Sequence, residues 1–219
     1  MAELRTEEEQ LEAIKRWWKE NGTSLIVGVV IAAAGVFGWK TWQDYQAGQA
    51  EAASMRYQQL LSLSGQETLD EAARQRADDL VSEITASHGD TLYADLASLL
   101  DARLAVDHDD PAAARQALEA VIEDSPRPYL QGLARLRLAR LQVAADQPEA
   151  ALASLEGEIP AALAAQRANT RGDAYQALGQ LDRARDAWRE AQSLSQQSGR
   201  PLYGVELKLD NLGVEEATL

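Results

Sequence analysis

The chain has 219 residues, of which 46% are hydrophobic and 26% are charged, and this balance is typical of a folded protein rather than a disordered one. The formal net charge is −14, because 35 acidic residues oppose 21 basic ones, so we do not expect a nucleic-acid-binding protein. Cysteine is absent, which excludes disulfides, thiol catalysis and thiolate metal sites. Good helix formers dominate the composition, which favours a helical protein.

An uncharged stretch near the N-terminus, from Asn21 to Trp39, predicts one transmembrane helix. At about 1.5 Å per residue, this stretch reaches across roughly 30 Å of bilayer hydrocarbon. Trp17 and Trp18 precede it, and Trp39 and Trp42 lie at its other end. Indole rings prefer the two membrane–water interfaces, so these tryptophans support a membrane-spanning segment.

Basic residues around this stretch predict its orientation. Lys15, Arg16 and Lys19 lie on the N-terminal side, whereas Lys40 is the only basic residue just after the stretch. The positive-inside bias therefore places the N-terminus in the cytoplasm and the remainder of the chain outside. We expect a cytoplasmic tail, a transmembrane anchor and a folded domain, at residues 1–20, 21–42 and 43–219.

Two alternatives compete with an uncleaved anchor. The first is a cleaved signal peptide, for which the small residues between Gln46 and Ala50 offer a weak cleavage site. The acidic leader before the apolar stretch argues against cleavage. The second alternative is a buried helix of a soluble protein, which the flanking tryptophans make less favourable.

The segment from Arg171 to Leu194 matches the tetratricopeptide signature, a pattern of small and aromatic residues that builds a pair of antiparallel helices. Small residues at two positions let the helices approach closely, aromatic residues fill the remaining space, and a glycine caps the turn. The six matching residues are Gly172, Tyr175, Gly179, Ala184, Trp188 and Ala191.

Two earlier segments repeat this unit in a degenerate form. Ala150 and Ala114 precede Ala184 at successive intervals close to the tetratricopeptide period of about 34 residues. Pro111 and Pro148 each favour the first turn of a second helix. Residues 67–86 resemble a further, poorly matching unit, and residues 202–212 are expected to cap the exposed end of the core.

These observations predict an all-α fold, in which a single N-terminal transmembrane helix precedes a tetratricopeptide-like solenoid of helical hairpins. No segment favours a strand. The expected helices span residues 7–62, 69–87, 91–107, 111–123, 128–145, 148–156, 160–178, 181–197 and 202–212.

Residues typical of a catalytic or metal site are sparse. His88 and His108 are the two histidines, and His108 lies within an acidic run from Asp107 to Asp110. A cation site is one interpretation of that run, but Asp110 before a proline is more simply a helix N-cap. Nucleophile elbows, phosphate loops and zinc-protease motifs are absent, so we expect no enzyme activity and no cofactor.

The first helix of each tetratricopeptide pair lines a concave surface that commonly holds extended peptides. Amide side chains there can bind a peptide backbone, and arginines can bind carboxylates. A solvated polar face without a ligand is the alternative. In the register of the signature, the candidate groove residues are Leu99, Arg103, Arg135, Gln142, Asn169, Asp173 and Gln176.

Taken together, these blocks resemble the YfgM family, the ancillary subunits of the bacterial SecYEG translocon. The N-terminal resemblance lies in EAIKRWWKENG, a short anchor containing GVV, and GWKTWQDYQ. The C-terminal resemblance lies in RGDAYQALGQLDRARDAW and ELKLDNL. The middle repeats are too degenerate to match residue by residue, so we transfer no functional residue to them.

The resemblance implies a bacterial inner-membrane protein with a periplasmic C-terminal domain. It implies association with SecYEG and with a PpiD-like periplasmic chaperone, and a passive role in handing on newly translocated, unfolded polypeptides without ATP. A structural scaffold for another envelope complex, with no client binding, is an alternative. A third possibility is a regulator whose tail binds a cytoplasmic protein, since Leu4, Leu11, Ile14 and Trp18 have amphipathic spacing.

Overall fold

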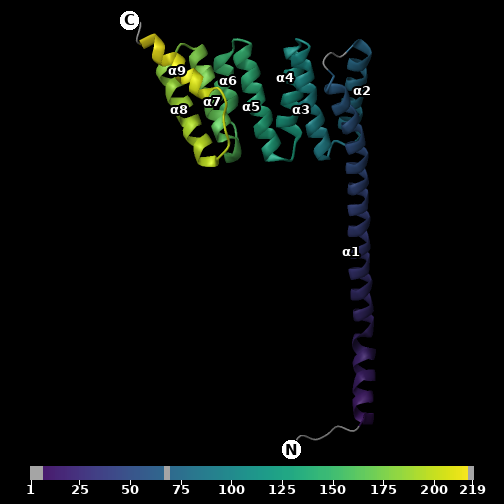
Figure 1. The fold of residues 1–219 in the computed structure, drawn as a ribbon. Coiled ribbons are helices and arrows are strands. Elements are labelled where there is room, and N and C mark those ends of the chain that lie inside the picture. Colours follow the sequence, from purple (N-terminus) through teal and green to yellow (C-terminus); the bar gives the residue numbers. More distant parts are fainter. Residues whose placement is uncertain (1–6, 67–69, 217–219) are drawn as a thin grey trace, which may run out of the picture. The chain divides into compact units, whose positions relative to one another are not determined.

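A computed structural model describes residues 7–66 and 70–216 (Figure 1). Within these ranges the chain forms nine α-helices and one short 3₁₀-helix, with no strand, which confirms the predicted all-α fold. The elements, in chain order, are α1 (Glu7–Ser64), α2 (Glu71–Ser87), α3 (Leu92–Asp107), α4 (Pro111–Asp124), α5 (Pro128–Ala144), α6 (Pro148–Glu156), η1 (Ala161–Leu163), α7 (Ala164–Ala177), α8 (Leu181–Ser198) and α9 (Val205–Glu216).

The chain divides into two compact units, with the boundary inside α1 between Glu51 and Ala52. The first unit is helical, and its apolar side chains from Leu25 to Phe37 are exposed in the absence of any covering element. Among the described residues, α1 is the one helix that is long and apolar enough to cross a membrane. Its apolar surface therefore suits a lipid environment rather than water.

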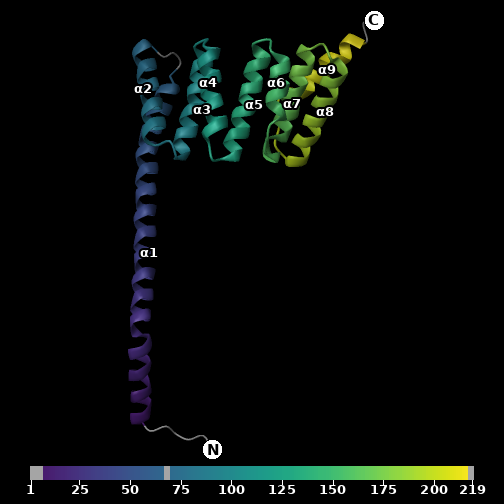
Figure 2. The same ribbon diagram turned by 180° about the vertical axis from the view of Figure 1, so that it is seen from behind.

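The second unit is a stack of helices in which each helix packs on its neighbours along the chain. Figures 1 and 2 show the hairpins α3–α4, α5–α6 and α7–α8 following one another from teal to yellow. Four core clusters lie between successive helices rather than in one central core. This nearest-neighbour packing is the property that defines a helical-repeat solenoid.

The end of α1 belongs to this stack as its first helix. Leu60 is fully buried and packs with Leu80 and Ile84 of α2 and with Ala97 of α3. The side chain of Arg56 also pairs with Glu83 of α2, with 2.6 Å between Nε and Oε1. The last turns of α1 and all of α2 thus form the hairpin that the sequence matches only poorly.

The three later hairpins share one turn geometry, although only the last matches the signature fully. Asp109, Asp146 and Gly179 adopt the left-handed conformation, with φ values of 60°, 56° and 70°. In each turn, the next backbone N–H donates to a carbonyl five residues earlier, at 2.8–2.9 Å. This is the Schellman pattern that ends a helix with a left-handed residue. Aspartate replaces glycine in two turns because it tolerates this conformation better than most residues.

Helix starts follow the predicted capping residues in part. The carboxylate of Asp110 accepts a hydrogen bond from the backbone N–H of Ala113 at 3.0 Å, which confirms the N-cap interpretation. Two starts differ from the prediction. A 3₁₀ turn after Pro160 precedes α7, and α9 begins at Val205 because Gly204 adopts a φ of 84°, which forms a turn rather than a helix.

Candidate functional site

The seven groove residues predicted from the signature register lie in different environments. Leu99 and Gln142 are buried, with exposed fractions of 3% and 7%. Leu99 belongs to the core between α3, α4 and α5, and the Gln142 side-chain oxygen accepts a hydrogen bond from Ser154 of α6 at 2.8 Å. These two side chains serve packing between helices and are not available to a partner on the surface.

Arg135 is also held within the fold. Its side chain lies against Gly157, where an added Cβ atom would be 2.9 Å from the Arg135 Cδ atom. Its Nε atom is buried and has no hydrogen-bond partner within the described structure. Arg103 and Gln176, in contrast, are exposed on α3 and α7. The register therefore brings some candidates to the surface and leaves others inside.

Asn169 and Asp173 of α7 come together, but the chain's own last helix covers them. Lys208 of α9 donates hydrogen bonds to the side-chain oxygens of Asn169 at 3.0 Å and of Asp173 at 2.5 Å. The indole N–H of Trp188 donates to Asp173 as well, at 3.0 Å. The ammonium group also lies 5.6 Å from the Trp188 ring centroid, within the range of a cation–π interaction.

The signature residues explain why this end of the stack packs so closely. Trp188 has an exposed fraction of 0%, and a Cβ atom added at Gly172 would lie 2.4 Å from its Cδ1 and Nε1 atoms. Ala184 and Ala191 are buried beside it, and Tyr175 packs against the same core cluster. The terminal helix α9 adds Val205 and Leu212 to this cluster, as expected of a cap.

A cavity of about 410 Å³ lies between α3, α4 and α5, and we refer to it as the α3–α5 cavity. Its volume falls within the range of roughly 300–1,000 Å³ that is typical of ligand sites. Five apolar residues and three arginines line it. They are Ala102, Arg103 and Val106 from α3, Leu118 from α4, and Arg137, Arg140, Leu141 and Ala144 from α5.

The α3–α5 cavity gathers three positively charged side chains in a chain that is acidic overall. Burial lowers the pKa of Arg137, and the neighbouring charge of Arg103 lowers it further. Burial also lowers the pKa of Arg140, with an opposing contribution from Asp173 and a smaller lowering by Arg137. Like charges thus repel one another across the cavity, and an added anion would relieve that repulsion.

The hydrogen bonds of these arginines hold them in place without neutralising them. Arg137 donates to the backbone carbonyl of Leu99 on α3 at 3.0 Å, and Arg140 donates to the hydroxyl of Thr170 on α7 at 3.2 Å. Within the described ranges, neither guanidinium has a carboxylate partner within 4.0 Å. Arg103 makes a 3.5 Å pair with Asp107, one turn along the same exposed helix face.

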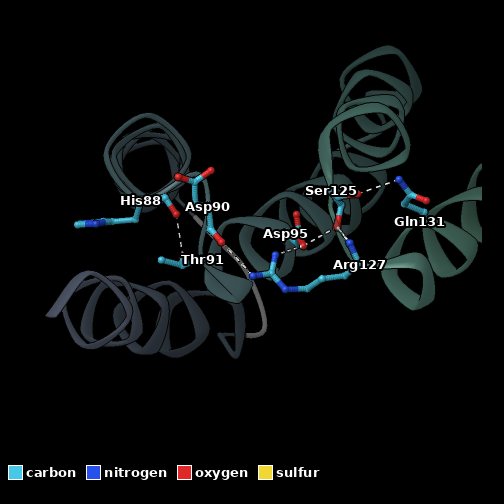
Figure 3. Close-up of polar contacts among 7 residues, drawn as sticks. All are labelled: His88, Asp90, Thr91, Asp95, Ser125, Arg127 and Gln131. Carbon is cyan, nitrogen blue, oxygen red and sulfur yellow. Dashed lines mark hydrogen bonds and ion pairs between the residues drawn. The ribbon is translucent and has the colours of Figure 1, made fainter. Parts of the chain in front are cut away.

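A buried polar network at the other end of α3 fixes the helices that form this cavity (Figure 3). The carboxylate of Asp95, with an exposed fraction of 7%, accepts hydrogen bonds from Ser125 at 2.7 Å and from Arg127 at 2.9 Å. Arg127 also donates to the backbone carbonyl of Asp90 at 2.9 Å. Figure 3 shows these side chains converging from the α2–α3 turn, α3 and the α4–α5 turn.

Sequence reasoning missed both the network and the α3–α5 cavity. Asp95 lies between apolar residues in the first turns of α3, and that was the available signal of a buried ion pair. Arg137 and Arg140 lie outside the signature positions, so the register gave no reason to select them. The Asp95 carboxylate is paired with protein donors, which gives the network a structural role, whereas Arg137 and Arg140 have no carboxylate within 4.0 Å in the described part of the chain.

No metal site competes with this cavity: across residues 7–66 and 70–216, no group of three or more metal-ligating side chains could hold an ion. The acidic run from Asp107 to Asp110 instead ends α3 and caps α4. The α3–α5 cavity is therefore the candidate site that the described residues support best.

Comparison with known proteins covers nearly the whole chain. A family described as a tetratricopeptide repeat-like domain matches residues 15–214. Proteins named ancillary SecYEG translocon subunit are similar to the chain. The one from Escherichia coli K12 is 32% identical over 208 residues, which cover 95% of this chain and 97% of the relative.

Two further relatives carry the same name. The protein from Haemophilus influenzae Rd is 31% identical over 206 residues, covering 94% of this chain and 97% of the relative. The protein from Neisseria gonorrhoeae is 27% identical over 214 residues, covering 97% and 100%. No solved structure matches the chain.

Proposed function

Because this chain belongs to the family of ancillary SecYEG translocon subunits, with a tetratricopeptide repeat-like domain, we propose that it is a membrane-anchored adaptor of the SecYEG translocon. The observation that carries this proposal is the length of the similarity, which extends through both the membrane-competent part of α1 and the helical stack. The role is non-enzymatic: the helical stack supplies a surface for protein contacts.

The anchor gives this adaptor its physical advantage. A helix that crosses the inner membrane keeps the stack close to the exit of the translocon, so the effective concentration of emerging chains near it is high. The proposed arrangement has residues 1–20 in the cytoplasm, residues 21–42 in the bilayer and residues 43–219 in the periplasm. The clustered Lys15, Arg16 and Lys19 before the apolar stretch support this orientation.

Association with a PpiD-like periplasmic chaperone and passive holding of unfolded, newly translocated proteins are the finer parts of the proposal. Repeat stacks of this kind bind peptides through exposed side chains, and the α3–α5 cavity combines an apolar surface with charge. No ATP-dependent step is needed, because binding and release at such a surface follow from affinity and concentration alone.

Crosslinking in intact membranes, followed by purification of this protein and identification of the attached proteins, tests the translocon association. Recovery of SecY, SecE or SecG supports the proposal. Recovery of an unrelated envelope complex with no translocon component would overturn it and leave a structural scaffold as the function.

The lack of cysteine allows a sharp test of orientation, because any introduced thiol is unique in the chain. We propose to compare Glu9→Cys in the tail with Gln116→Cys on an exposed position of α4. A membrane-impermeant maleimide should label the Gln116 variant once the outer membrane is opened, and the Glu9 variant only after the inner membrane is disrupted. The reverse pattern would contradict the proposed orientation.

A further inference from the structure

The α3–α5 cavity combines three features that point to one kind of ligand. Its surface is apolar along Val106, Leu118 and Leu141, and two of its arginines lack a carboxylate partner in the described structure. Arg137 and Arg140 line the cavity and are exposed as residues, although their hydrogen-bonded guanidinium groups are partly buried. An apolar ligand would leave the positive charges unsatisfied, and a small anion would leave the apolar surface in water.

The chain's own terminal helix shows how a helical segment is held on this kind of surface. Helix α9 buries Val205 and Leu212, and between them Lys208 binds the carboxylate of Asp173. The segment is thus held by apolar side chains with one opposite charge at helical spacing. The α3–α5 cavity presents the same combination with the sign of the charge reversed.

Resting on the proposed adaptor function, we propose that the α3–α5 cavity binds an acidic amphipathic segment of a partner protein. The segment would place a large apolar side chain against Leu118 and Leu141 and one or two Asp or Glu side chains against Arg137 and Arg140. Arg137 and Ala144, which both line the cavity, are separated by about 10 Å along the axis of α5, which corresponds to two turns of a helix. Residues one or two turns apart in a bound helix match this spacing.

Electrostatics makes the α3–α5 cavity selective for an acidic segment. The carboxylate relieves the repulsion among Arg103, Arg137 and Arg140, whereas a basic segment would add to it. The chain as a whole is strongly acidic, with a net charge of −14, and repels an acidic segment elsewhere. Binding should therefore be local to the cavity and should weaken as the salt concentration rises.

A peptide-binding experiment with the full-length protein in nanodiscs of neutral lipid tests the proposal. The probe is a fluorescent peptide of about four helical turns, with leucines on one face and glutamates beside them, and with both ends blocked. Three matched peptides replace the glutamates by glutamine, the glutamates by lysine, or the leucines by serine. We expect the glutamate–leucine peptide to bind at least about fivefold more tightly than each matched peptide.

Variants of the protein then locate the site. The double variant Arg137→Gln/Arg140→Gln should weaken binding by about tenfold or more, and Arg103→Gln by about fivefold. Arg189→Gln is the matched control, because it removes the same charge from an exposed position of α8 and should leave binding unchanged. Arg103→Gln also guards against a folding artefact, since Arg103 makes only an exposed pair within α3.

Several outcomes would overturn the proposal. They are equal binding of the glutamate and lysine peptides, binding that survives all the cavity variants, and no binding of the glutamate–leucine peptide. Crosslinking to SecY, SecE or SecG in intact membranes is measured on the unaltered protein and on the same variants. In the unaltered protein, absence of glutamate–leucine peptide binding with crosslinking retained would reject the cavity ligand alone, and absence of both would reject the adaptor function as well.

Discussion

Two regions of the helical stack, the α3–α5 cavity and the surface of α7 near α9, treat their charged residues in opposite ways. On α7, the polar residues Asn169 and Asp173 face a lysine from α9, so the chain neutralises its own charge and covers its own surface. Between α3 and α5, Arg137 and Arg140 have no such partner among the described residues, and a cavity remains. The comparison shows that a position in the repeat register does not by itself decide whether a side chain is exposed and unpaired, because contacts from other helices decide it.

The largest expected loss of stability comes from disturbing the packing of α7 against α8 at the C-terminal end of the stack. Gly172→Ala places a Cβ atom within 2.4 Å of the buried Trp188 ring, so the ring or the helix has to move. We expect a loss of about 3 kcal/mol in the free energy of unfolding, measured by urea denaturation followed by circular dichroism. Gly48→Ala is the control, since nothing lies within 4 Å of a Cβ atom there. A stability equal to that of the control would show that Trp188 does not pack against α7 in this way.

The next largest loss of stability is expected from breaking the Asp95 network beside the α3–α5 cavity. Asp95→Ala leaves Arg127 and Ser125 without their shared partner at the junction of α3 with α5. We expect a loss of about 2 kcal/mol, below the value for a fully buried pair because Arg127 is partly exposed. Thermal unfolding measures this loss, with Asp182→Ala at an exposed position of α8 as the control. An unchanged melting temperature would mean that the network does not hold the α3–α5 geometry.

A smaller effect is expected from a substitution that makes the two regions more alike. Lys208→Met removes the ammonium group that neutralises Asp173, while most of the apolar stem remains. The expected loss is about 1 kcal/mol, because the pair is partly exposed. A double-mutant cycle with Asp173→Asn measures the interaction directly. Additive losses from the two substitutions would show that the Lys208–Asp173 pair between α9 and α7 contributes nothing to stability.

The smallest effect concerns the acidic side of α3. Burial and the nearby carboxylate of Asp78 raise the pKa of Asp101. A raised folded-state pKa means that the ionised form is disfavoured in the folded protein, so stability falls as the pH rises through that pKa. Asp101→Asn should therefore raise the melting temperature at pH 7, and the gain should vanish below the unfolded-state pKa of about 3.9. A gain that is independent of pH would contradict this explanation.

Much of the fold followed from local sequence signals. The uncharged stretch before Trp39, Pro111 and Pro148 at helix starts, and the glycine and tryptophan of the last hairpin each reflect strong local chemistry. The prediction that the last helix begins at residue 202 was wrong by three residues, because a turn at Gly204 competes with the helix pattern. Asp109 and Asp146 escaped notice as left-handed turn residues, since aspartate is common in many other contexts.

The candidate site was less predictable for a physical reason. Whether Gln142 is buried, or whether Arg140 has a carboxylate partner, depends on which side chains face them from other helices. The pattern of a single helix does not contain that information. Ser154 donates a hydrogen bond to Gln142, and Lys208 donates one to Asp173, both through contacts between separate helices. Arg103 was selected by register and lines the cavity, but its neighbours Arg137 and Arg140 were not selected.

Photocrosslinking in intact membranes tests the central claim most directly. A photoreactive residue replaces Val106, which lines the α3–α5 cavity with an exposed fraction of 51%, or Arg189 on α8 as the control. We expect adducts with translocon subunits or exported proteins from position 106, weakened by Arg137→Gln/Arg140→Gln, and few from position 189. Equal adducts from both positions, or none from position 106, would contradict it.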